Sequence, residues 1–228
     1  MKKLIVILIA LTCSQSLAGT GITVKRVKGA AEVRRGVSEE WVRVKAGIAL
    51  GPENTIKTAR NASLTILAEG RKLNVPELTV LDVGDLREMS QEELLLKLAM
   101  ADVRVAPPRD ESGETVIPNT TIVHGKNMAV PQITASNQKD FRDMQVRGTK
   151  LLYDYGFYPT CILKAKQTML YYPELKSRFE FRCMIANALE KMKLKGEAIG
   201  EYLSLTSIKL SPSEREKVED NIRRLEQH

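Results

Sequence analysis

The sequence predicts an α+β protein in which an all-β N-terminal module is followed by an α-helical domain. Two patterns carry this prediction. Apolar residues alternate with polar ones from Gly19 to about Leu86, which is the period of β-strands. From Ser136 to Gln227 they recur at the 3.6-residue spacing of amphipathic helices. The chain has 228 residues, 43% of them apolar, so it is long enough for two packed parts.

The first 18 residues have the order of parts found in a secretory signal peptide. Two lysines precede an apolar run that is too short to span a bilayer, and cleavage is expected between Ala18 and Gly19. A lipoprotein anchored through Cys13 is the less favoured alternative, because Ala10 and Thr12 fit a bacterial lipobox poorly. We therefore expect a protein of the periplasm or cell envelope, with no membrane span after cleavage.

The positive charge does not indicate a nucleic-acid-binding protein. The formal net charge is +7, from 35 basic and 28 acidic residues. These charges are spread along the chain, whereas nucleic-acid binding calls for a clustered basic patch with interleaved aromatic residues. We expect no nucleic-acid partner.

The N-terminal part reads as six or seven short strands separated by turn residues. The clearest run is Gly47 to Pro76, where Arg60-Asn61 predicts a turn and Glu69-Gly70 predicts a two-residue hairpin loop. Strands of this length and spacing are typical of a sandwich, a barrel or a short solenoid.

This part of the chain, about residues 21–86, resembles a FecR-type domain. The resemblance includes the segment VKGAAEVRRG, the turn-strand AGIALGPENTIKT and the stretch NASLTILAEGRKLNVPELTVL. The matching positions are Gly29, Trp41, Gly47, Leu50, Ile56, Thr58, Ser63, Gly70, Leu73 and Pro76. They are glycines at turns and apolar residues of a core, so the resemblance implies an envelope β module suited to interaction.

A single helix of about residues 90–104 follows the strands. Ser90 and Glu93 have the spacing of a capping box, and Pro107-Pro108 ends the pattern. We expect this helix to be inserted in a β module of residues 19–131 and to pack on that module. The segment after it, Arg109 to Pro131, is expected to be a linker whose Thr120–Val123 run returns to the β module, within a continuation of the FecR-type resemblance at 114–125.

Five amphipathic helices are expected in residues 136–228. Gly156, Pro173 and Gly196 separate the first four, and the fourth is expected to span Glu197 to Leu210. Capping boxes are expected at Ser177-Arg178-Phe179-Glu180 and at Ser211-Pro212-Ser213-Glu214.

The helical domain contains an internal repeat. LLYDYGFYPTCILKAKQTMLYYP aligns with ALEKMKLKGEAIGEYLSLTSIKLSP, each joining two helices. The pattern resembles tetratricopeptide (TPR) repeats, with two copies and a C-terminal capping helix. The resemblance implies a groove for peptides or helices, to which tyrosines would contribute amphipathic contacts: Tyr153, Tyr155, Tyr158, Tyr171 and Tyr172.

Cys161 and Cys183 are expected to remain free thiols. Counted from the turn near Leu175 at about 1.5 Å per residue, they are offset by roughly 9 Å along neighbouring helices. A disulfide does not tolerate that offset.

The sequence contains no motif that indicates a catalysed reaction. A nucleophile needs a nearby base, but the two histidines are His124 in the linker and His228 at the end. A metal site needs several convergent ligands, and no phosphate-binding or zinc motif occurs. We expect no catalytic residue, no cofactor and no metal site, and hence no enzyme.

Three functions follow from this reading. The first is a non-catalytic exported envelope protein that binds another protein through a FecR-like module and TPR-like helices. The second is a peptidoglycan- or glycan-binding module in which Trp41 is a ligand contact. The third, a FecR-like component of signal transduction, would need a membrane span.

Overall fold

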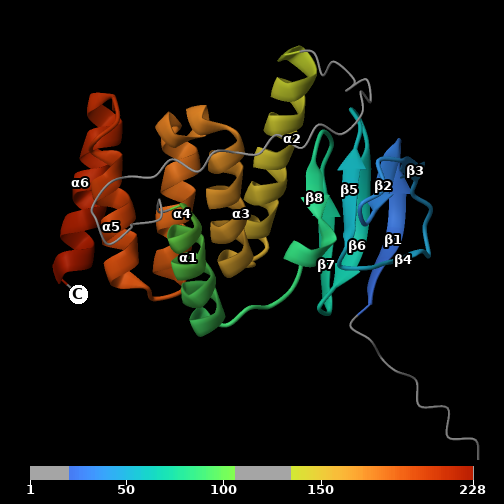
Figure 1. The fold of residues 1–228 in the computed structure, drawn as a ribbon, viewed down its shortest axis with the longest axis horizontal. Helices are drawn as coiled ribbons and strands as arrows, with labels where there is room; N and C mark the ends of the chain where they lie inside the picture. Colours follow the sequence, from blue (N-terminus) through green and yellow to red (C-terminus); the bar gives the residue numbers. More distant parts are fainter. Residues whose placement is uncertain (1–20, 106–134, 228) are drawn as a thin grey trace, which may run out of the picture.

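The computed structural model describes residues 21–105 and 135–227 and confirms the α+β class. Several expectations lie outside these ranges: cleavage between Ala18 and Gly19, the alternative anchor Cys13, the strand Thr120–Val123, and both histidines. The described residues form two four-stranded antiparallel sheets followed by six α-helices (Figure 1). No helix within these ranges is both long and apolar enough to cross a membrane.

Residues 21–105 contain eight strands, one or two more than expected, because three of the observed strands have only two or three residues. In spatial order, the first sheet consists of β4 (Ala49–Leu50), β1 (Ile22–Lys28), β6 (Ser63–Ala68) and β7 (Arg71–Val75). The second consists of β3 (Trp41–Arg43), β2 (Ala31–Arg35), β5 (Asn54–Thr58) and β8 (Val80–Asp82). All neighbouring strands are antiparallel.

The two sheets share one core, which makes the β part a sandwich. Val24, Leu64 and Ile66 of the first sheet lie in the same buried cluster as Val33 and Ile56 of the second. Their alternation along each strand puts one apolar face of each sheet inward. Of the three architectures that the sequence left open, the structure has the sandwich.

The expected turns set the register of this sandwich. Glu69 and Gly70 have φ angles of 49° and 72°, the left-handed geometry of a two-residue hairpin between β6 and β7. Asn61 also has a positive φ, 58°, in the turn before β6. Gly29 has φ 72°, and a Cβ there would lie 2.9 Å from Cα of Ala62, so the close approach of these two loops requires a glycine.

Five helices follow one another away from the sandwich in chain order (Figure 1). They are α2 (Ala135–Asp154), α3 (Tyr158–Tyr171), α4 (Phe179–Lys191), α5 (Lys195–Leu205) and α6 (Pro212–Gln227). The fourth predicted helix ends at Leu205, five residues earlier than expected. The capping box at Ser211 is confirmed, since Ser211 N donates to Glu214 Oε2 at 2.8 Å and Glu214 N to Ser211 Oγ at 3.3 Å. The one at Ser177 is wrong: α4 starts after Arg178, with no side-chain cap.

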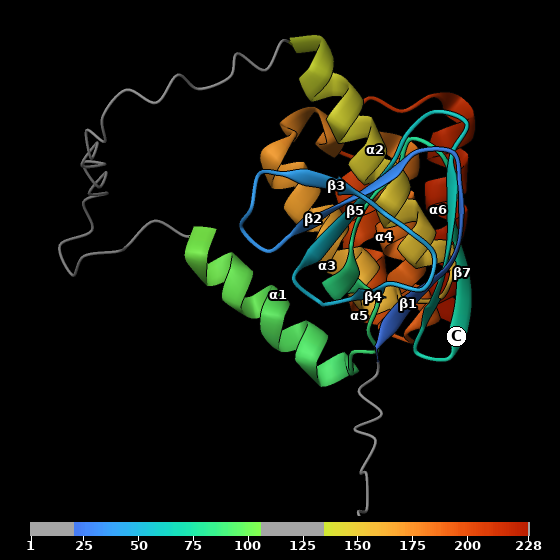
Figure 2. The same cartoon turned by 90° about the vertical axis from the view of Figure 1, so that its right-hand side faces the viewer.

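Helix α1 (Gln91–Val105) forms where the sequence predicts a helix, with Glu93 N donating to Ser90 Oγ at 3.1 Å. The prediction that it packs on the β module is wrong. Leu94 is fully buried in a cluster with Ile162 and Ala165 of α3. Figure 2 shows α1 beside the helices and away from the strands. The segment after β8 leads the chain away from the sandwich, so the apolar face of α1 packs on α3.

Helices α2 and α3 close one side of the sandwich, where β7 and β8 are the edge strands. Leu151, Leu152, Phe157 and Cys161 belong to the same buried cluster as the strand residues. Tyr155 Oη accepts a hydrogen bond from the backbone N–H of Asn74 in β7 at 2.9 Å. The sandwich and the helices are therefore joined through a continuous core, and the edge strands are covered rather than open to association.

Candidate functional site

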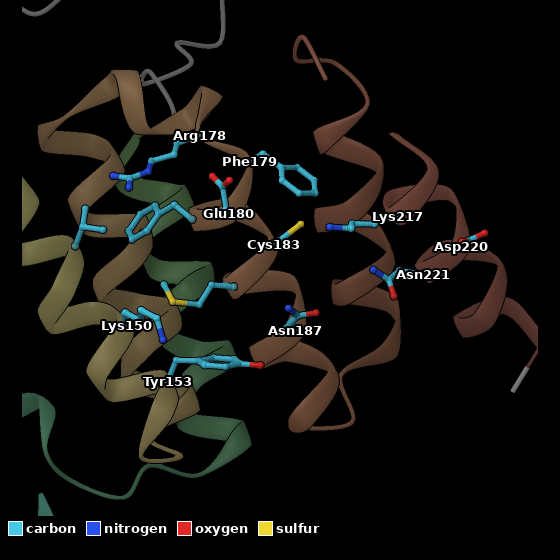
Figure 3. Close-up of a pocket in the computed structure, with 13 residues that line it drawn as sticks. Lys150, Tyr153, Arg178, Phe179, Glu180, Cys183, Asn187, Lys217, Asp220 and Asn221 are labelled. Carbon is cyan, nitrogen blue, oxygen red and sulfur yellow. The ribbon is translucent and has the colours of Figure 1, made fainter. Parts of the chain in front are cut away.

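A groove of about 650 Å³ lies between α2, α4 and α6 (Figure 3). Successive helices alternate between the two sides of the array, so α2, α4 and α6 lie on the same side. The groove is lined by Val146, Lys150, Tyr153, Arg178, Phe179, Glu180, Phe181, Cys183, Met184, Asn187, Lys217, Asp220 and Asn221. We call this surface the helical groove.

The floor of the helical groove is apolar and aromatic. Phe181 is buried, whereas Tyr153, Phe179, Cys183 and Met184 are only half-buried and so present carbon and sulfur surface to the groove. Tyr153 is held by an edge-on contact with Tyr158, with ring centroids 5.5 Å apart. Half-buried aromatic residues in a concavity are typical anchors for a bound side chain.

Charged groups stand at the rim of the groove. Lys150 pairs with Asp154 at 2.8 Å, and Asp220 pairs with Arg223. The cations Arg178 and Lys217 form no ion pair with any other described residue. Both are exposed, and so is Glu180, which also lines the groove and forms no ion pair with another described residue. The rim therefore offers two positive charges and one negative charge to a ligand.

Two asparagines between floor and rim are fixed by a polar network. The hydroxyl of buried Tyr202 in α5 lies 2.7 Å from Asn187 Oδ1 and 2.7 Å from Glu190 Oε1. Glu190 in turn accepts from Arg224 of α6 at 2.7 Å, and Arg224 also donates to Asn221 at 3.0 Å. This network ties α4, α5 and α6 together and so sets the shape of the groove.

The thiol of Cys183 faces the groove, whereas that of Cys161 is fully buried between the helices and the sandwich. Neither forms a disulfide. Burial raises the pKa of Cys161 to about 12 and that of Cys183 to about 11. Both are therefore protonated at neutral pH, and neither has the lowered pKa of a nucleophilic thiol.

Trp41, the residue singled out for glycan contact, lies far along the sequence and the fold from the groove, on the edge strand β3. Its ring is half-buried and covers two cations of the same sheet face: Lys57 Nζ is 4.3 Å and Arg34 Cζ 5.4 Å from the ring centroid. Lys57 also pairs with Glu32 at 2.7 Å. The cations hold the ring in place over the sheet.

The five tyrosines expected at a binding surface have separate positions. Tyr153 lines the groove, and Tyr158 supports it. Tyr155 bonds to β7, Tyr171 is exposed elsewhere on α3, and Tyr172 is half-buried. The sequence analysis did not identify Phe179, Asn187 or Lys217 as residues of a binding surface. The available signal was their position: Phe179 and Asn187 lie on the first helix of the second repeat and Lys217 lies on the last helix.

No group of three or more metal-ligating side chains gathers among the residues described here. No protein-family model, no curated protein sequence and no solved structure matches this chain. The helical groove is therefore the candidate site on its geometry and chemistry alone.

Proposed function

We propose that this chain is a non-catalytic exported protein of the cell envelope that binds a segment of another protein in the helical groove. The supporting observation is the groove itself: a concavity of about 650 Å³ with an aromatic floor, fixed asparagines and the unpaired cations Arg178 and Lys217. Its size and lining suit side chains of a peptide or helix. The sandwich serves as the rigid support on which the helices are mounted.

Two resemblances support this proposal. The glycines at turns and the shared core of the sandwich agree with what a FecR-type domain requires at Gly29, Gly47 and Gly70, all of which have positive φ. The helix pairs α2–α3 and α4–α5, with α6 as a last helix, have the order expected of two TPR-like repeats with a cap. Two repeats are few for a free-standing array, and docking on the sandwich supplies the missing burial.

The chemistry of the rim indicates what the partner segment carries. A carboxylate on the partner would complement Arg178 and Lys217, and an apolar side chain would fill the space over Phe179 and Met184. Exposed pairs of this kind contribute little affinity, so the aromatic floor would supply most of it and the charges would orient the segment.

Photo-cross-linking from two positions of α6 tests the proposal. Lys217 lines the groove, whereas Arg215 is exposed on the same helix and is not part of the groove lining. With benzoylphenylalanine at one position or the other, we expect a discrete protein adduct in envelope extracts from position 217 and none from position 215. Arg178→Glu should weaken the adduct from 217. Equal adducts from both positions, or none from either, would contradict the proposal.

A second candidate function is binding of peptidoglycan or another glycan at Trp41. The observation that favours it is the half-exposed ring, held by Lys57 and Arg34 in the manner of an aromatic platform. Retention on purified peptidoglycan should then fall for Trp41→Ala and persist for Trp41→Phe. Absence of retention for the wild-type chain would rule this function out.

A further inference from the structure

Three ionisable side chains meet where the helices contact the sandwich. Asp82 ends β8, Asp85 lies in the short 3₁₀ helix η1 (Val83–Asp85) that follows, and Lys164 comes from α3. Lys164 Nζ forms an ion pair with Asp82 Oδ2 and lies 3.7 Å from Asp85 Oδ2. The Lys164 side chain is only 12% exposed, whereas those of Asp82 and Asp85 are 38% and 26% exposed, so these charges are partly shielded from water. We call this group the junction cluster.

The junction cluster contains two carboxylates and one ammonium group. Asp82 has the closer contact with Lys164 and also accepts a hydrogen bond from Thr55 Oγ1 at 2.7 Å. Asp85 Oδ2 is buried and has no hydrogen-bond partner within the described residues. When both carboxyl groups are ionised, two negative charges therefore share the single ammonium group of Lys164, and Asp85 has the longer contact at 3.7 Å. The cluster then has a net negative charge, which is costly where water is partly excluded.

The surrounding elements do not supply the missing charge at close range. Arg87, after η1, pairs with Glu93 of α1, and Arg34 of β2 lies over Trp41 and 3.5 Å from Thr55. Arg34 acts on Asp82 and Arg87 acts on Asp85, in each case only at a distance. Cys161, one turn before Lys164 on α3, is a neutral buried thiol.

We propose that the junction cluster makes the contact between the sandwich and the helices sensitive to pH: with Asp85 protonated the junction is tight, and with Asp85 ionised it opens more often. Because Leu151, Leu152, Phe157 and Cys161 belong to the same core as the strands, opening of the junction also exposes part of that core. A change in the acidity of the compartment would thereby alter how firmly the helical groove is mounted.

The direction follows from the charges. Burial raises the pKa of Asp85 to about 6, against the opposing effect of Lys164, while Lys164 and Thr55 keep the pKa of Asp82 below its usual value. A carboxyl group with a raised pKa stabilises the closed junction below its unfolded value and loses that contribution as the pH rises through about 6. A shift of about two pKa units corresponds to at most about a hundredfold change in the opening equilibrium.

The buried thiol of Cys161 reports on opening of this junction. In a chain with Cys13→Ser and Cys183→Ser, the rate of reaction with 4,4′-dithiodipyridine is compared between the parent and Asp85→Asn at each pH, so the intrinsic pH dependence of the reagent cancels. At pH 7.5 we expect the parent to react ten- to a hundredfold faster than Asp85→Asn. At pH 5 we expect this difference to be about tenfold smaller than at pH 7.5, and near pH 3.5, below the usual pKa of the Asp85 carboxyl, we expect the two rates to converge.

A second variant keeps the test decisive if Asp85→Asn folds poorly. In Asp82→Asn, Lys164 is left to Asp85 alone, so the opening caused by ionised Asp85 should no longer increase between pH 5 and pH 7.5. Glu77→Gln is the control variant and should keep the increase seen in the parent. The rate of Asp82→Asn divided by that of Glu77→Gln should therefore fall from pH 5 to pH 7.5. The proposal is overturned if the parent and Asp85→Asn differ by the same factor at both pH values. It is equally overturned if Asp85→Asn reacts faster at pH 7.5, since an ionised Asp85 would then hold the junction closed.

Discussion

Gly148 of α2 lies directly against the backbone of Val80 in β8. A Cβ placed on Gly148 would be 1.9 Å from the carbonyl oxygen of Val80, closer than atoms can approach. The helix thus packs on an edge strand at a distance that glycine alone permits. This contact, the shared core around Leu152 and the bond from Asn74 to Tyr155 mount the helical groove on the sandwich.

Gly148→Ala is expected to destabilise the chain by about 3 kcal/mol or more, because the helix or the strand must move to admit the methyl group. Gly200→Ala is the matched control, since Gly200 also lies within a helix and a Cβ there would meet nothing within 4 Å. That control should be neutral or stabilise by up to about 1 kcal/mol through helix propensity. Urea unfolding measures both, and equal effects would contradict the close contact.

Tyr155→Phe should cost about 1 kcal/mol, because the backbone N–H of Asn74 on β7 loses its acceptor. Tyr171→Phe is the control: its side chain is 71% exposed and should tolerate the loss of its hydroxyl without a measurable change. Thermal unfolding of the two variants separates the outcomes. If Tyr155→Phe were as stable as the wild type, water would be able to replace the tyrosine hydroxyl as the acceptor for the backbone N–H of Asn74.

Ser211→Ala should destabilise α6 by about 1 kcal/mol, since Ser211 and Glu214 cap the first turn reciprocally. Ser213→Ala, two residues later in the same exposed turn, serves as the comparison. Because Lys217 and Asn221 of the groove lie on α6, fraying of this helix should also weaken partner binding. Chemical unfolding followed by the cross-linking assay measures both effects.

Cys183 is expected to react with a thiol reagent faster than Cys161, because the former lines the groove and the latter is fully buried. Burial raises the pKa of Cys183 to about 11, so its rate should rise about tenfold per pH unit between pH 7 and 9. A bound partner segment should protect Cys183 and leave Cys161 unaffected. Mass spectrometry of peptides labelled with and without cross-linked partner provides the measurement, and unchanged labelling of Cys183 would place the partner elsewhere.

Local patterns account for most of the secondary structure. Alternation of apolar residues predicted the strands around Val33 and Ile66, and the positive φ angles of Asn61 and Gly70 follow from turn chemistry that is visible in the sequence. The Ser211 cap is equally local. The Ser177 cap failed because a 3₁₀ helix, Pro173–Ser177, runs up to the start of α4 and uses that serine.

Local patterns did not predict which distant segments contact one another. The amphipathic face of α1 identifies Leu94 as buried but does not say whether strands or helices bury it, and the structure puts it on α3. The helical groove likewise depends on tertiary packing. Phe179 of α4 and Lys217 of α6 are 38 positions apart, and they line the same groove because the chain reverses twice, between α4 and α5 and between α5 and α6.

Local preferences determined one part of this structure, and packing between distant segments determined the other. Backbone preferences and the period of apolar residues act over a few positions, so the chain itself specifies strands to about Asp82, helices beyond Ala135 and the turns between them. The choice of a sandwich, the seat of α2 on β8 and the meeting of Asp82, Asp85 and Lys164 arise only when segments some 80 residues apart pack together. Packing is decided by shape and buried charge, which no stretch of sequence contains on its own.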